Sequence, residues 1–182
     1  EKKFYDEIMP EIAAIDNQFT KTINNSNFKN ELVEKFGKHY FDLIKMELKA
    51  FNPKIVPLMK QENDLVNKYN SLIASAEIQF NGQILNLTGL DTFKQNLNRD
   101  VRKKAFKAMN DFFTENKKEL DEIFDKLVKI RHQKSQILGF KNFIPLAYLN
   151  MKRSDYGPSE IKEYRKKIVQ YIVPLASKMQ EE

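Results

Sequence analysis

The chain has 182 residues, of which 41% are apolar and 31% are charged, and this balance excludes an intrinsically disordered tail. Its five glycines and six prolines are too few for a β-sandwich and favour helices. The absence of cysteine excludes disulfides, thiolate metal sites and a cysteine nucleophile, and the dispersed net charge of +6 identifies no nucleic-acid partner.

Apolar residues in the first part of the chain recur every three or four positions, which is the period of an α-helix. We predict three helices over about residues 3–24, 28–51 and 54–75. Pro53 ends the second helix, because the residue before a proline disfavours helical geometry. Asn52 can cap the third helix, and Pro57 suits its first turn.

The sequence "AEIQFNGQILNL" breaks this helical pattern. Ile78 and Phe80 alternate with polar residues, and the alternation resumes after Asn81 and Gly82. Asn-Gly supplies the two residues with positive φ that a tight hairpin turn requires. We therefore predict a β-hairpin over about residues 76–87.

Helical periodicity returns after the hairpin and continues through the rest of the chain. Thr88 and Asp91 resemble a capping box, Asn98 and Asn142 can cap helices, and Gly139 can end one in the left-handed conformation. Pro158 suits the first turn of the last helix. We predict helices over about residues 89–96, 99–138, 143–151 and 158–180. The pattern of the helix over residues 99–138 allows an interruption near residue 116.

The expected fold is therefore mainly α, a multi-helix lobe with one small β-hairpin. No internal repeat or low-complexity linker is present, so we expect residues 1–182 to form one helical unit.

No signal peptide or membrane-length apolar run is visible, and together with the lack of cysteine this favours a cytoplasmic protein. The chain lacks an initiator Met and ends within a helical pattern. We expect it to be an internal piece of a larger protein.

The sequence contains no complete catalytic motif. His39 and His132 are the only histidines, and neither begins the His-Glu-x-x-His pattern of a zinc site. We interpret His39 as a half-buried helix residue and His132 as a cation near a helix C-terminus. There is no glycine-rich phosphate loop and no Gly-x-Ser-x-Gly nucleophile elbow. The basic segment "NRDVRKKAFK" is typical of an exposed helix face.

Several motifs in the second half of the chain, taken in order, resemble the oligoendopeptidase F family of zinc metallopeptidases. The resemblance extends from about Ile78 to the end. The matching features are Arg99-Asp100 with Arg102 and Ala105, Leu127-Val128 ahead of Arg131, "LGFKNF", Tyr148, "MKRSDY" and "IVPLASK". A looser form of the Leu-Gly-aromatic segment recurs in the related thimet-type oligopeptidases. The resemblance implies a larger helical peptidase that encloses a channel and cuts short peptides.

The same resemblance implies a zinc ion held by a His-Glu-x-x-His helix and a later Glu. Those residues lie downstream of this sequence, so no metal ligand and no catalytic residue is expected in this segment. The segment is expected to form scaffold and cleft wall, to be inactive alone, and to bind no zinc. Its expected partners are short peptide substrates and the remaining catalytic part of the same chain, with no membrane and no nucleic acid.

Four residues are the best candidates to face the substrate cleft or to support it: Tyr148, Arg153, Tyr156 and His132. Arg153 could pair with a carboxylate of a peptide terminus, of Asp155 or of the missing part of the chain. The alternative interpretation is that these side chains only pack. The last helix presents a broad apolar face from Ile161 to Leu175, so the segment is also expected to self-associate when alone.

Two other classes of function remain open at this level. One is a free-standing helical module that binds protein partners, and the other is a basic helical domain that binds nucleic acid. A downstream His-Glu-x-x-His in the encoded sequence would favour the peptidase.

Overall fold

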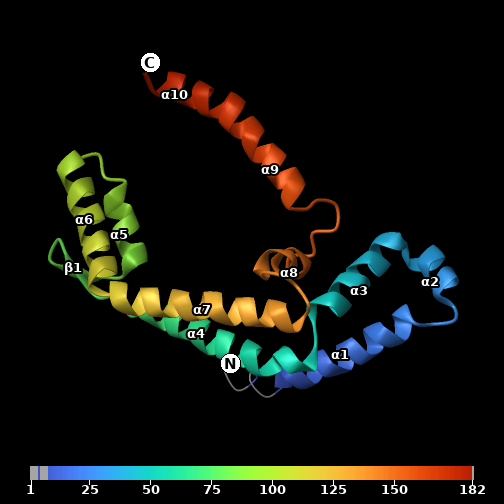
Figure 1. The fold of residues 1–182 in the computed structure, drawn as a ribbon. Coiled ribbons are helices and arrows are strands. Elements are labelled where there is room, and N and C mark those ends of the chain that lie inside the picture. Colours follow the sequence, from blue (N-terminus) through green and yellow to red (C-terminus); the bar gives the residue numbers. More distant parts are fainter. Residues whose placement is uncertain (1–3, 5–7, 182) are drawn as a thin grey trace. The chain divides into compact units, whose positions relative to one another are not determined.

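Helices form most of the chain in the computed structural model, which describes Phe4 and residues 8–181 (Figure 1). One two-stranded antiparallel sheet accompanies them in the described residues. The predicted fold class, mainly α with one small hairpin, is confirmed. The residues group into two compact units, one formed by residues up to Lys54 together with those from Ser135 onward, and the other by Ile55–Lys134. That the two units form one domain stays a prediction.

The first unit has its core between two segments that are distant in sequence. Helix α3 (Lys38–Ala50) buries Phe41 and Ile44, and α8 (Phe143–Asn150) buries Leu146. These two helices contact each other, and α1 (Met9–Asn24) and α2 (Lys29–Phe36) contact α3. The predicted start of the first helix, at residue 3, lies outside the described residues.

The helix predicted over residues 28–51 is two helices, and the prediction of one was wrong. Gly37 separates α2 from α3 with φ of +85°, a left-handed value that interrupts helical geometry. Its N–H donates to the carbonyl of Val33 (2.8 Å) and closes the last turn of α2. The apolar period continues across Gly37, so periodicity alone does not reveal this break.

The chain's last helical segment contains a π-helical turn, which is wider than a turn of α-helix. It consists of α9 (Pro158–Lys167), the π-helical turn η3 (Ile168–Ile172) and α10 (Val173–Glu181). Val173 donates its N–H to the carbonyl of Ile168, five residues back. This turn lies just before Pro174, which has no N–H to donate and whose ring crowds the preceding turn. The helix predicted over residues 158–180 is present, with Pro158 in its first turn as expected.

In the second unit, α4 (Val56–Ala74) and α7 (Lys117–Ile137) run antiparallel and side by side (Figure 1). A short 3₁₀ turn, η2 (Pro53–Ile55), leads into α4. Ion pairs join the two helices at separate levels, from Lys68 to Glu119 (2.8 Å) and from Glu62 to Arg131 (2.7 Å).

The hairpin lies in the second unit, as β1 (Ile78–Phe80) and β2 (Gln83–Leu85), with Ile78 opposite Leu85. Asn81 and Gly82 have φ values of +51° and +76°, which confirms the predicted turn. Ile78 packs with Ala76 and with Leu90 of α5 (Leu87–Lys94), and α6 (Arg99–Glu115) covers this cluster.

Side-chain caps set the starts of α5, α6 and α8. Asn98 accepts the N–H of Asp100 and Asn142 accepts that of Ile144, as predicted. The capping box expected at Thr88 was wrong, because Asn86 caps α5 by accepting the N–H of Gly89 (2.8 Å). Helix α5 therefore begins two residues earlier than expected.

The single helix predicted over residues 99–138 is two helices, α6 and α7, with the break at Asn116, the position where the pattern allowed an interruption. Gly139 ends α7 with φ of +83°, which confirms its role as a left-handed cap. The N–H groups of Gly139 and Phe140 donate to the carbonyls of Gln136 and Ser135. This pair of bonds is a Schellman motif.

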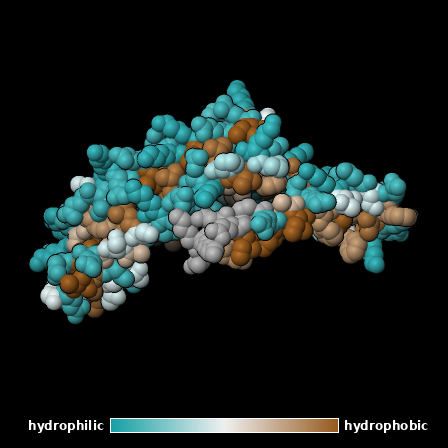
Figure 2. Space-filling view, turned by 90° about the horizontal axis from the view of Figure 1, so that it is seen from below, coloured by the Kyte–Doolittle hydropathy of each residue, from teal (hydrophilic) through white to brown (hydrophobic). Residues whose placement is uncertain are grey.

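None of the helices that the structure describes is long and apolar enough to cross a bilayer. Apolar side chains are nevertheless exposed in several patches between polar ones, as Figure 2 shows for one face.

Candidate functional site

Helix α8 and the segment that follows it carry three of the four candidate residues predicted from the sequence. Helix α8 ends in a second Schellman motif, in which Lys152 donates its N–H to Leu149 (2.9 Å) and Arg153 donates to Tyr148 (3.2 Å). Lys152 takes the left-handed conformation, with φ of +53°. The motif turns the chain sharply and places Arg153 beside the helix from which Tyr148 projects.

The guanidinium of Arg153 lies over two tyrosine rings. Its central carbon is 5.7 Å from the ring centre of Tyr148 and 5.1 Å from that of Tyr156. Such cation–π contacts attract the cation and hold it in a defined position. The structure therefore brings together Tyr148, Arg153 and Tyr156, although whether they contact substrate stays a prediction.

An open hollow of about 550 Å³ lies around this segment, lined by His39 and residues 151–156. The ammonium of Lys152 pairs with Glu47 of α3 (2.7 Å), and the hydroxyl of Ser154 donates to Asp155 (3.2 Å). His39 lies near the start of α3 and is exposed, so its interpretation as a half-buried residue was wrong. Sequence reasoning missed its place at the hollow, which depends on α3 lying against α8.

His132 is not part of this site. It lies on an exposed face of α7 in the other unit. Its proposed cleft role stays a prediction.

A partly buried charge cluster joins α4 and α7 within the second unit. Glu62 accepts hydrogen bonds from Arg131 (2.7 Å) and from Lys134 (2.6 Å). Burial of Glu62 raises its pKa, but the hydrogen bonds from Lys134 and Arg131 outweigh burial, so its pKa is lower than the ordinary 4.5. No local pattern in the sequence indicates this cluster, because Glu62 is about 70 positions away from Arg131 and Lys134. Its role is to hold the two helices together.

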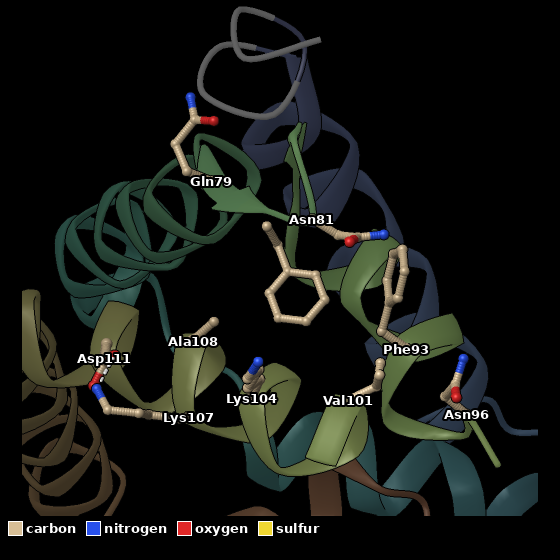
Figure 3. Close-up of a pocket in the computed structure, with 10 residues that line it drawn as sticks. Gln79, Asn81, Phe93, Asn96, Val101, Lys104, Lys107, Ala108 and Asp111 are labelled. Carbon is tan, nitrogen blue, oxygen red and sulfur yellow. Dashed lines mark hydrogen bonds and ion pairs between the residues drawn. The ribbon is translucent and has the colours of Figure 1, made fainter. Parts of the chain in front are cut away.

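A second hollow, of about 510 Å³, lies between the hairpin and helices α5 and α6. Figure 3 shows Phe93 and Lys104 directed toward it, with Lys107 paired to Asp111 (2.6 Å) at one side. The rings of Phe80 and Phe93 meet edge to face, 5.0 Å apart. These contacts are typical of packing between a hairpin and its covering helices.

The described residues contain no group of three His, Cys, Asp or Glu side chains that could hold a metal ion. The sequence has no cysteine, and its two histidines lie in different units. The donor set of the described residues therefore does not fit a zinc site.

The sequence signature of the Peptidase M3 N-terminal domain matches residues 1–51, and that of Peptidase family M3 matches residues 92–182. No curated protein matches the sequence.

Three solved structures are similar to almost the whole chain. A protein assigned as oligoendopeptidase F is 37% identical, with a TM-score of 0.94 over 98% of this chain and 32% of its own. One of the same assignment from Bacillus anthracis strain Ames is 36% identical, with a TM-score of 0.93 over 99% of this chain and 33% of its own. PZ peptidase A, with an inhibitor, is 39% identical, with a TM-score of 0.94 over 99% of this chain and 32% of its own. The chain thus spans about a third of the length of these proteins.

Proposed function

Because the chain belongs to peptidase family M3, we propose that it forms scaffold and cleft wall of a zinc metalloendopeptidase that hydrolyses short peptides. The observation that carries this proposal is the similarity to three peptidase structures over 98–99% of the chain, at 36–39% identity. It favours the peptidase over a free-standing interaction module or a nucleic-acid-binding domain. A cytoplasmic location is part of the same proposal.

Zinc, the catalytic base and the metal ligands would come from outside these 182 residues, because the donor set described here does not fit a zinc site. In such enzymes the metal polarises water and the scissile carbonyl. The contribution of this chain would be to shape and line the space in which a peptide lies. The chain alone is expected to bind no zinc and to cut no peptide. Stoichiometric zinc by elemental analysis of the isolated chain, lost in His39→Ala or His132→Ala, would contradict that expectation.

The proposed partner of α9 and α10 is the remaining part of the same protein. These helices and the turn η3 contain no buried residue, and Tyr164, Val169 and Leu175 are all more than half exposed. Relatives of three times this length contain the same fold, so further chain is available to cover the face. The isolated chain should therefore self-associate or bind a dye for apolar surfaces, and the full-length protein should do neither.

The proposed function is tested with the full-length protein and a short fluorogenic peptide. A metal chelator should abolish hydrolysis. Tyr148→Ala and Arg153→Ala should each lower turnover without reducing the zinc content, because they alter the cleft wall and not the metal site. Tyr69→Ala, an equal truncation of a half-exposed tyrosine on α4, serves as the control and should keep normal turnover. Normal turnover in both Tyr148→Ala and Arg153→Ala would contradict the cleft-wall role.

A further inference from the structure

We propose that Arg153 binds a carboxylate group of the peptide substrate, in the hollow lined by His39 and residues 151–156. The carboxylate would belong either to the C-terminus of the peptide or to an acidic side chain. This inference rests on the proposed peptidase function and adds the chemical group that one wall of the cleft recognises.

The first observation concerns the burial of the Arg153 side chain and its contacts. It is half-buried, and the rings of Tyr148 and Tyr156 occupy positions over its guanidinium. Among the residues that the structure describes, no carboxylate lies within ion-pair distance, and only the backbone N–H of Arg153 has a hydrogen bond, to Tyr148. The guanidinium N–H groups are therefore available to an acceptor in the hollow.

The second observation is the backbone that presents Arg153. The left-handed position of a Schellman motif is usually glycine, as it is at Gly139, but here it is Lys152 with φ of +53°. A left-handed lysine is strained, and strained residues that persist cluster at functional sites. Lys152 pairs with Glu47 (2.7 Å), so the turn that presents Arg153 is in contact with α3.

The third observation is the charge of the hollow. The cation of Lys152 is paired with Glu47, whereas Arg153 has only ring contacts for its side chain. Asp155 also lines the hollow, but it is exposed, accepts from Ser154 and makes no ion pair with Arg153. A guanidinium has a planar fork of donors that matches the two oxygens of a carboxylate. Because the tyrosines already fix its position, little side-chain entropy is lost when a ligand binds.

The experiment uses the full-length protein and three fluorogenic peptides of one sequence. The first peptide has a free C-terminal carboxylate, the second is amidated, and the third is amidated and carries one glutamate near its C-terminus. Values of kcat and KM are measured for wild type, Arg153→Gln, Arg153→Lys and a control, Arg165→Gln. Arg165 is an exposed arginine of α9 whose side chain donates to a carbonyl of its own helix. Thermal melting followed by circular dichroism checks that each variant is folded.

We expect wild type to have a KM about tenfold lower, or more, for peptides with the recognised carboxylate than for the plain amide, since charge-assisted hydrogen bonds are among the strong ones. Arg153→Gln should remove this preference, and any loss of kcat should be the same for all three peptides. Arg153→Lys should restore part of the preference. Arg165→Gln should keep it. A preference for the free acid alone identifies the C-terminus as the ligand, and a preference that the glutamate restores identifies a side chain.

Two results would overturn the proposal in distinguishable ways. If wild type cuts the peptides but Arg153→Gln changes the KM of all three equally, or of none, the carboxylate assignment is wrong and the peptidase proposal stands. If folded wild-type protein cuts none of the peptides and a chelator makes no difference, the proposed function fails and the assignment fails with it.

Discussion

The β-hairpin with α5 and α6 and the C-terminal helices α9 and α10 both carry regularly spaced apolar residues, but they bury them very differently. Leu90 and Ala105, in the hairpin region, are completely buried. Leu175 and Met179, on α10, are 55% and 70% exposed. The hairpin region packs strand on helix and helix on helix, whereas the main contacts of α9 and α10 are with the turn between them (Figure 1).

This difference shows that an apolar stripe predicts a helix but does not say what covers it. A single helix cannot remove its own stripe from water, so burial needs a second element at the right position. The hairpin region has that element within these 182 residues. For α9 and α10 we propose that it lies in the remaining part of the protein.

The largest expected effect comes from truncating one leucine in each region of the isolated chain. Leu90→Ala should lower the free energy of unfolding by about 2 to 5 kcal/mol, because it leaves a cavity in a closed core. Leu175→Ala should change it by less than about 0.5 kcal/mol, as is usual for surface substitutions. Urea denaturation followed by circular dichroism measures both.

The same pair of variants in the full-length protein sharpens the comparison. If the remaining chain covers α10, Leu175→Ala should become clearly destabilising there. An effect as small as in the isolated chain would contradict the proposed docking of this face.

Next in size is the effect of Glu62→Gln, which tests how firmly α4 and α7 are joined. The side chains of Glu62 and Lys134 are only 16% and 9% exposed, so removing the carboxylate leaves a nearly buried ammonium without its charge partner. We expect a loss of about 2 kcal/mol, less than for a fully buried pair because Arg131 is partly exposed. Lys129→Gln, which removes an exposed partner of Asp125, should cost almost nothing in the same denaturation experiment.

Glu62 also makes stability depend on pH. Its pKa is lower in the folded chain than its ordinary value of 4.5, so its stabilising contribution is present above that pH and is lost as pH falls through the lower folded value. The melting temperature of wild type should therefore fall below about pH 4.5, and Glu62→Gln should fall less over that range. Parallel curves for the two proteins would show that Glu62 has no such role.

A smaller effect is expected at the hairpin turn. Gly82 has φ of +76°, and a Cβ atom added there would meet no atom within 4 Å, so the main expected cost of a substitution is the backbone conformation. Gly82→Val should lower stability by about 1 kcal/mol or more, because a β-branched residue resists positive φ. Gly82→Asn is the matched control and should cost less, since asparagine tolerates this conformation. Equal stability of all three proteins would contradict the observed turn.

The smallest effect, and the only expected gain, is at Lys152. Lys152→Gly should relieve left-handed strain and raise stability by up to about 1 kcal/mol, minus the small contribution of the exposed pair with Glu47. Glu47→Gln alone measures that pair. In the full-length protein we expect the more stable Lys152→Gly variant to cut peptides with the recognised carboxylate less well. A gain in stability without loss of turnover would show that the strain serves no function at this site.

Helix caps are among the features that could be predicted from the sequence, because they depend only on neighbouring residues. Asn98, Gly139 and Asn142 were predicted from their sequence neighbours because a cap bonds to backbone within a few residues. The division at Gly37 and the cap at Asn86 were missed, since the apolar period continues across Gly37 and Thr88 offered an equally good local pattern.

The candidate site could be predicted in part for the same reason. Tyr148, Arg153 and Tyr156 lie within one short segment, so their proximity follows from one helix end and one turn. His39 and Glu47 reach that segment only because α3 packs on α8, a contact between parts of the chain about 100 residues apart.

The sequence by itself determined the helical class, the hairpin with its Asn81–Gly82 turn, and most helix ends, because these depend on side chains within a few positions. The tertiary structure alone decided which stripes are buried, that Glu62 meets Arg131 and Lys134, and that no carboxylate among the described residues pairs with Arg153. The physical reason is that burial and charge pairing depend on distances in space between segments far apart along the chain. The spacing of apolar residues along the chain does not contain information about those distances.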